Sequence, residues 1–196
     1  MKVLLVGIDN SGYDTSNHTV NPIILKGDNM PSTGAGHVFE EYVYEKLIIP
    51  EGWINLTPYE LKSKPSRNGQ IYTHKEFPTQ FEKYFNFNTK TVWSKNIKPD
   101  FVFYNPELKK VVALEVKKQE QSGSVDEKLQ TGGKKLKRLR KLFNIALQIP
   151  YENISYSYLL KKEDFDKKEY QDTFDDILED GCRYYFVDEN FSFEIQ

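Results

Sequence analysis

Residues 99–119 read PDFVFYNPELKKVVALEVKKQ, which is two apolar, strand-like runs separated by a polar turn. The first run covers residues 101–104 and is mostly aromatic, and the second covers residues 111–117 and is rich in valine. The asparagine, proline and glutamate at 105–107 are typical of a turn. This stretch therefore predicts an antiparallel hairpin.

The length of the turn decides which side chains of the hairpin face each other. With four residues in the loop, Asn105 lies opposite Lys110, and counting back along the ladder places Asp100 opposite Glu115. Directly opposite residues have Cβ atoms about 4.5–5.5 Å apart, so these two carboxylates can hold a divalent metal ion. Because strand side chains alternate with a period of two, Lys117 points to the same face as Glu115.

This arrangement resembles the bipartite motif of the PD-(D/E)XK nucleases, the superfamily that includes many type II restriction endonucleases. Here the motif reads Pro99-Asp100, then 14 residues, then Glu115-Val116-Lys117. Strand-like runs flank it, and a candidate helix with a glutamate precedes it, as the family requires. The alternative is an exposed hairpin with ordinary surface charges, which does not explain why Glu115 interrupts an apolar strand.

The resemblance implies an α/β fold with a restriction endonuclease-like core, in which a central mixed β-sheet is flanked by helices. The predicted order agrees with this core: a helix at 36–48, the hairpin, a helix at 134–147 and a strand at 154–160. We expect a single nuclease domain over residues 1–196, with a core of about 36–160 and additions at both ends.

Several further elements are predicted outside this core pattern. Residues 1–8 read as a strand, 91–93 as a possible strand, 169–179 as an acidic helix and 182–187 as a strand. Residues 50–90, which contain four prolines and many aromatic residues, give no clear order of elements.

The resemblance also implies a role for each residue of the motif. Asp100 and Glu115 would bind one or two Mg²⁺ ions, which Mn²⁺ can replace, and a backbone carbonyl near Val116 would complete the ligand set. Magnesium suits oxygen ligands and retains several waters. Lys117 would orient the attacking water and offset negative charge in the transition state, without a covalent intermediate.

Two adjacent glutamates in the helix at 36–48 are candidates for a further acidic residue of the site. At 100° per residue, Glu40 lies about 20° from Leu47, at the margin of the apolar face, whereas Glu41 lies on the solvated side. Many family members bring a glutamate from this helix into the metal site, so the resemblance implies Glu40. The alternative is an ordinary charged helix surface.

The residues after Lys117 have two readings each. Gln119 shares the face of Lys117 if the strand continues, and then contacts the scissile phosphate or a water; otherwise it is a polar strand end. Residues 124–127 have the S-x-x-E form of a helix capping box. They begin a short helix, and with Lys128 they either remain structural or contact DNA above the active site.

Positive charge is concentrated in residues 134–141, although the net charge of the chain is −2. Leu136, Leu139 and Phe143 define the apolar face of this predicted helix, so the cations occupy the remainder. They form either a solvated helix face or a phosphate-binding surface. Gly132 and Gly133 precede them and permit close approach of a backbone. The DNA-contact candidates are Lys128, Lys134, Lys137, Arg138, Arg140 and Lys141.

The remaining composition narrows the class of protein. Cys182 is the single cysteine, which excludes a disulfide framework and favours the cytoplasm. No apolar run approaches the roughly 20 residues that span a bilayer. The residues and the resemblance together imply a magnesium-dependent DNA endonuclease of the type II restriction kind, which cuts duplex DNA at a short specific site as a homodimer. The alternatives are a nuclease of repair or phage DNA processing, or a non-catalytic nucleic-acid-binding module.

Overall fold

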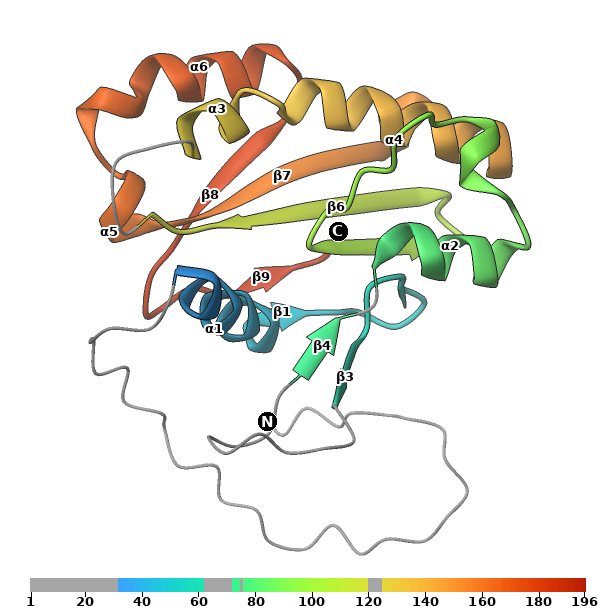
Figure 1. Cartoon of the computed structure of the whole chain (residues 1–196), viewed down its shortest axis with the longest axis horizontal. Helices are drawn as coiled ribbons and strands as arrows, with labels where there is room; N and C mark the ends of the chain where they lie inside the picture. The colour runs from blue at the N-terminus through green and yellow to red at the C-terminus, as the bar shows by residue number, and fades with distance from the viewer. Residues whose placement is uncertain (1–31, 62–71, 75, 120–124) are drawn as a thin grey trace, which may run out of the picture.

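A five-stranded mixed sheet forms the centre of the computed structural model, which describes residues 32–61, 72–74, 76–119 and 125–196 (Figure 1). Its strand order is β2-β5-β6-β7-β8, and the neighbouring pairs are antiparallel from β2 to β6 and parallel from β6 to β8. The strands are β2 (Ile54–Asn55), β5 (Phe101–Asn105), β6 (Lys110–Lys117), β7 (Ile154–Lys161) and β8 (Arg183–Val187). The predicted α/β core with a mixed sheet is confirmed.

The β5–β6 hairpin has the register that the sequence predicts. Asn105 pairs with Lys110 and Phe101 with Leu114, so Asp100 lies opposite Glu115, one step beyond the last pair. In the turn, the Asn105 side-chain oxygen accepts a hydrogen bond from the backbone N–H of Leu108 at 2.9 Å. This bond closes the turn at the length that sets the register.

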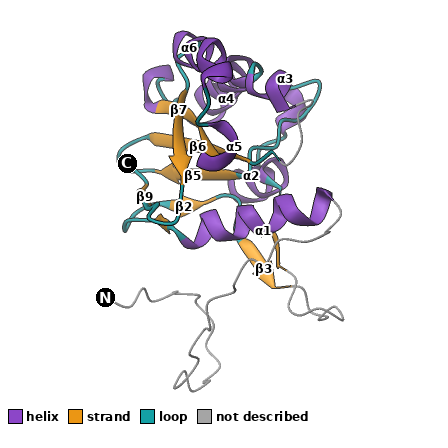
Figure 2. Ribbon diagram, turned by 90° about the vertical axis from the view of Figure 1, so that its left-hand side faces the viewer, coloured by secondary structure: helices purple, strands orange, loops and turns teal. Residues whose placement is uncertain are grey.

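Helices cover both faces of the sheet, and the period-two alternation of the strands decides which side chains meet which helices (Figures 1 and 2). Val111 and Ala113 of β6 belong to the core that contains α2 (Phe77–Phe85), α4 (Gly132–Leu147) and α6 (Gln171–Glu179). Val112, Leu114 and Val116 belong to the core under α1 (Ser32–Glu45). The odd-numbered side chains of β6 therefore point toward α4.

Short elements complete the described part of the chain. Two small sheets pair β1 (Leu47–Ile48) with β9 (Phe193–Glu194) and β3 (Tyr59–Leu61) with β4 (Tyr72–His74). The short helices are α3 (Val125–Leu129), α5 (Lys162–Phe165), η1 (Thr89–Thr91), η2 (Tyr151–Asn153) and η3 (Lys168–Tyr170). Among the helices described, none is long and apolar enough to cross a lipid bilayer.

Two sequence predictions differ from the structure. The helix predicted at 36–48 begins at Ser32 and ends at Glu45, because Leu47 pairs with Phe193 in a strand instead of continuing the helix. The strand predicted at 91–93 is wrong: Thr91 is the last residue of the 3-10 turn η1, and neither Val92 nor Trp93 belongs to a strand. The turn starts where the Asn88 side chain accepts the N–H of Lys90.

The C-terminal predictions are confirmed, with the helix of 134–147 starting two residues earlier and the strand of 154–160 extending one residue further. The predicted helix 169–179 and strand 182–187 correspond to η3–α6 and β8. Because β8 pairs with β7, the central sheet continues beyond residue 160. The strand predicted at 1–8 and the cap at Ser124 lie outside the described residues.

Candidate active site

The acidic cluster lies at the start of β5 and the end of β6, on the side of the sheet that faces α4. Lys117 Nζ is 2.7 Å from Glu115 Oε1 and 3.8 Å from Asp100 Oδ2. All three side chains are largely buried, with exposed fractions of 7% for Glu115 and 16% for the other two. The structure therefore brings together the acid, acid and lysine that the hairpin register predicts.

Asp100 is a buried carboxylate next to other acids. Its Oδ2 accepts the backbone N–H of Val116 at 2.7 Å. Burial, followed by the negative charges of Glu115 and Glu40, raises the pKa of Asp100 to about 7, against the opposing effect of Lys117. An additional cation at this carboxylate would relieve both the burial penalty and the repulsion.

Glu115 is in the opposite electrostatic situation, because partners surround both of its oxygens. Oε1 is 2.7 Å from Lys117 Nζ and 2.9 Å from the Nζ of Lys135, which comes from α4. The hydroxyl of Tyr156, on β7, donates to Oε2 at 2.7 Å. Burial raises the pKa of Glu115, but the two ammonium groups outweigh it and hold the pKa below its usual value. Glu115 is therefore ionised.

Lys117 connects the two acids to the backbone of its own strand. Its Nζ donates to the carbonyl oxygen of Val116 at 3.0 Å, which places that carbonyl, a predicted metal ligand, beside the carboxylates. Burial lowers the pKa of Lys117, but the nearby negative charges of Glu115, Asp100 and Glu40 raise it overall. The ammonium is thus a fixed positive charge at neutral pH.

Glu40 approaches the same cluster from α1, on the other side of the sheet. Its charge raises the pKa values of both Asp100 and Lys117, which requires that its carboxylate lie close to them. Glu40 and Glu41 are both partly buried, so burial alone does not separate them. What favours Glu40 is its electrostatic contact with the two motif residues.

Gln119 lies beyond the end of β6, so the condition under which it would share the face of Lys117 is not met. Its backbone N–H donates to Asp164 Oδ2 at 2.8 Å, and its side-chain oxygen accepts the hydroxyl of Tyr170 at 2.7 Å. These contacts hold Gln119 against α5 and η3. A contact between Gln119 and substrate stays a prediction.

Lys135 and Tyr156 contact Glu115, yet the sequence analysis did not select them. Lys135 lies two helical turns before Leu142, a separation of roughly 20° around the helix, and so belongs to the buried side of α4. Leu142 is fully buried, so the helical periodicity of the sequence already indicated that Lys135 lies on the buried side. Tyr156 offers no comparable signal, because the register of a parallel strand is not set by a short turn.

Most of the DNA-contact candidates form one row on α4. The exposed residues Lys134, Lys137, Arg138 and Lys141 follow the spacing i, i+3, i+4, i+7, and we call them the α4 basic row. Arg140 lies beside this row, where its Nε donates to the Tyr151 carbonyl at 3.0 Å. Lys128 is exposed on α3.

Gly132 and Gly133 permit a close approach, as predicted, but the approaching groups are side chains of this protein. A Cβ at Gly132 would lie 2.9 Å from the ring of Tyr158, and a Cβ at Gly133 would overlap the carboxylate of Asp180. The glycines therefore allow the first turn of α4, and with it Lys135, to lie close to the sheet.

The donor set fits a hard divalent cation. Two carboxylates and a backbone carbonyl offer oxygen ligands, and burial, followed by the negative charges of Glu115 and Glu40, raises the pKa of Asp100. In the part of the chain that the structure describes, no group of three or more His, Cys, Asp or Glu side chains is arranged for metal binding. An ion here would rely on few protein ligands and on water, as Mg²⁺ does.

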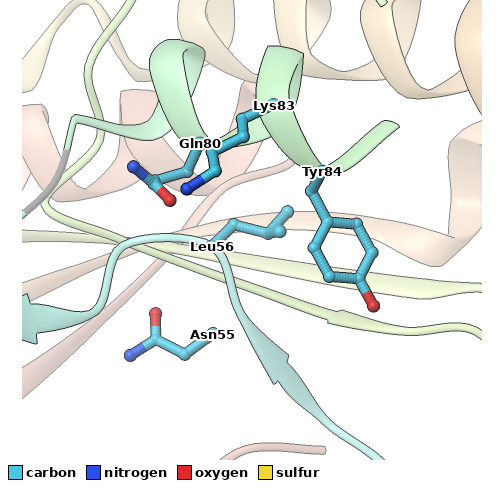
Figure 3. Close-up of a pocket in the computed structure, with 5 residues that line it drawn as sticks. All are labelled: Asn55, Leu56, Gln80, Lys83 and Tyr84. Atoms are coloured by element: carbon cyan, nitrogen blue, oxygen red, sulfur yellow. The ribbon is translucent and has the colours of Figure 1, made fainter. Parts of the chain in front are cut away.

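A surface pocket elsewhere on the molecule does not include the residues of the acidic cluster. It has a volume of about 390 Å³ and lies between β2 and α2 (Figure 3). Its lining residues are Asn55, Leu56, Gln80, Lys83 and Tyr84. None of the carboxylates or lysines of the cluster lines it, so we locate the active site by the cluster.

Comparison with known proteins gives a family match. The family model described as a PD-(D/E)XK nuclease superfamily domain matches residues 32–131, which is more than half of the chain and includes Glu40, Asp100, Glu115 and Lys117. The chain therefore belongs to the PD-(D/E)XK nuclease superfamily, whose members are nucleases that generally use divalent metal ions. No curated protein and no solved structure matches it.

Proposed function

We propose that this protein is a magnesium-dependent endonuclease that hydrolyses phosphodiester bonds in duplex DNA. The observation that carries the proposal is the cluster of Asp100, Glu115 and Lys117 on two adjacent strands, with 2.7 Å between the lysine and Glu115. A module that only binds nucleic acid has no need of two buried acids and a lysine on one face of the sheet. The cluster therefore favours catalysis over binding alone.

The charge state of each residue in the cluster determines the role that we propose for it. Asp100 and Glu115 would hold the ion, with the Val116 carbonyl as a third oxygen, and Asp100 would lose its proton as the ion enters. The ion would polarise the scissile phosphate and stabilise the charge that develops on it. Lys117 is positively charged and fixed by three oxygens, so it would orient the attacking water and offset the transition-state charge.

More specifically, we propose that the protein is a type II restriction enzyme that cuts DNA at one short sequence. A single cluster cuts one strand, so cleavage of both strands requires two copies, which supports a homodimer. The proposal keeps the cytoplasmic location expected from the single cysteine. A role in repair or in phage DNA processing would use the same chemistry on a different substrate.

The decisive experiment is to incubate the purified protein with defined plasmid DNA and MgCl₂ and to sequence the resulting ends. A restriction enzyme gives ends that map to one short sequence, whereas a repair or processing nuclease gives ends defined by DNA structure. Activity should require Mg²⁺ or Mn²⁺, and Ca²⁺ should support binding but little cleavage because it prefers looser, higher coordination. Full cleavage in excess chelator would refute the metal-dependent mechanism.

A further inference from the structure

Two lysines from different elements bind the same oxygen of Glu115. Lys117 Nζ lies 2.7 Å and Lys135 Nζ 2.9 Å from Oε1. Lys135 extends from the first turn of α4, passes beside the ring of Tyr156 with its Nζ 5.9 Å from the ring centroid, and is 23% exposed. The carboxylate that should bind a divalent ion is thus already neutralised by protein.

This arrangement creates a conflict over acceptor positions. A carboxylate has about four lone-pair positions, two on each oxygen. The two ammonium groups use those of Oε1, and the Tyr156 hydroxyl uses one on Oε2. An ion that binds Oε1 must therefore displace a lysine.

Lys135 is the lysine that can leave. Lys117 is also near Asp100 and donates to the Val116 carbonyl, so three oxygens of the β5–β6 hairpin hold it in place. Lys135 belongs to a separate helix and is more exposed than Lys117. It also lies next to Lys134, the first residue of the α4 basic row, so a displaced Lys135 ammonium has a short path to a phosphate bound along that helix.

We propose that Lys135 and the divalent ion compete for Oε1 of Glu115, and that the displaced Lys135 binds a phosphate of the nucleic acid. Ion binding and substrate binding are then coupled through this side chain, each favouring the other. The inference rests on the proposed nuclease function, and it assigns to Lys135 a role that the two carboxylates and Lys117 do not supply.

The first test measures Ca²⁺ binding to the protein without DNA, by isothermal titration calorimetry. Lys135→Met removes the competing charge and keeps most of the length of the side chain, so Ca²⁺ should bind about tenfold more tightly, a change of about 1.4 kcal/mol. Lys137→Met, on the exposed side of the same helix, should leave the Ca²⁺ affinity unchanged. Equal or weaker binding by Lys135→Met would overturn the proposal, because a lysine that merely supports Glu115 gives that result.

The second test measures the coupling between ion binding and DNA binding. The affinity for a fluorescent duplex is determined by anisotropy with and without Ca²⁺. The wild-type protein should gain more affinity from Ca²⁺ than Lys135→Met does, because binding free energies are coupled reciprocally. Lys137→Met should lose DNA affinity by the same factor in both conditions. An identical gain for the wild type and Lys135→Met would overturn the coupling.

Two further measurements separate the possible failures. If the wild-type protein binds no divalent ion, the proposed function is wrong. If the wild type binds the ion and cleaves DNA, but Lys135→Met does not change the Ca²⁺ affinity, only the inference about Lys135 is wrong. Lys135→Arg keeps the charge and should bind Ca²⁺ as weakly as the wild type. If Lys135→Met lowers the thermal unfolding midpoint, the comparison of Lys135→Arg with the wild type still tests the role of the charge.

Discussion

Two acids placed opposite each other in one hairpin have opposite charge behaviour, because the lysines are distributed unequally between them. Glu115 contacts Lys117 and Lys135 at 2.7 and 2.9 Å, whereas among the described residues Asp100 has Lys117 alone as a cationic partner, at 3.8 Å. Burial, followed by the charge of Glu115, raises the pKa of Asp100 to about 7, and this one lysine does not offset the rise. The structure thus makes Asp100 the residue that depends most on an added cation.

Alanine at Asp100, Glu115 or Lys117 should abolish cleavage of plasmid DNA while circular dichroism shows an intact fold. We expect a loss of at least about a hundredfold for each, because each replacement removes a charged group that acts on the transition state or holds the ion. Glu163→Ala removes an exposed acid of α5 and should retain full activity. Near wild-type cleavage by Glu115→Ala would remove the cluster from the mechanism.

The stability of the metal-free protein should depend on pH through Asp100. Between the usual aspartate pKa of 3.8 and the raised value of about 7, the folded state binds more protons than the unfolded state. The free energy of unfolding should therefore fall as pH rises through this window. Asp100→Asn lacks this titration, so the wild type should gain stability relative to it between pH 8 and pH 5, in urea titrations with chelator.

Glu115 does not disturb that measurement. Its pKa is lowered, so the stability it contributes is present above its unfolded value of about 4.5 and is lost only at more acidic pH. A difference between the wild type and Asp100→Asn that stays constant from pH 8 to pH 5 would show that Asp100 is not perturbed.

The two glutamates of α1 provide a matched pair of variants. Glu40→Gln should reduce cleavage by tenfold or more, roughly the effect of one charge–charge contact, because the Glu40 charge acts on both Asp100 and Lys117. Glu41→Gln changes the neighbouring residue in the same way and should leave the rate near that of the wild type. Equal rates for the two variants would remove Glu40 from the site.

At the scale of elements, local rules predicted the hairpin well and the surroundings of the site less well. A four-residue turn and the period of two were enough to place Asp100, Glu115 and Lys117 together. Lys135 was missed because the cations of the helix were considered as one surface, although the position of Lys135 relative to Leu142 places it on the buried side.

Other elements depend on contacts that no local pattern encodes. Tyr156 reaches Glu115 because β7 pairs in parallel with β6, at a register that aligns Tyr156 with Ala113, two residues before Glu115. Residues 91–93 look like a strand, but Thr91 ends a 3-10 turn, and the indole N–H of Trp93 donates to the carbonyl of Arg138, 45 residues away. Contacts between residues far apart in the sequence therefore determine the features that the sequence analysis missed or predicted wrongly.

The α4 basic row makes a prediction about salt. Each phosphate contact releases counterions, so the slope of log affinity against log salt is about −0.9 per contact on duplex DNA. Replacing Lys134 and Lys137 with Gln should weaken binding to all sequences alike and reduce the slope by about one to two units. Binding would be compared for the wild type and the double variant, on two unrelated duplexes over a series of salt concentrations.

The control for that experiment replaces two exposed lysines outside the α4 basic row, Lys83 of α2 and Lys90 of η1, with Gln. It makes the same change in net charge outside the row and should leave the slope unaltered. If both double variants shift the slope equally, the row is a solvated helix face and the effect reflects net charge alone.

At the scale of the whole molecule, the candidate active site includes residues beyond the region that the family match covers. The match ends at residue 131, yet Lys135 and Tyr156, which hold Glu115, come later in the chain. The matched region supplies β2, β5 and β6, while β7 and β8 complete the sheet. The family match therefore covers the proposed catalytic residues but not the whole central sheet.

The central place of β6 in the sheet has a practical consequence for anyone who would express the matched region by itself. In a fragment of residues 32–131, β6 would become an edge strand, with its backbone N–H and C=O groups unpaired on one side and its apolar side chains without α4. Long, apolar, unprotected edges recruit other strands and aggregate. We expect the fragment to sediment in the pellet after lysis, whereas the full chain stays in the supernatant; a soluble, monomeric fragment in gel filtration would show that the sheet tolerates an open edge at β6.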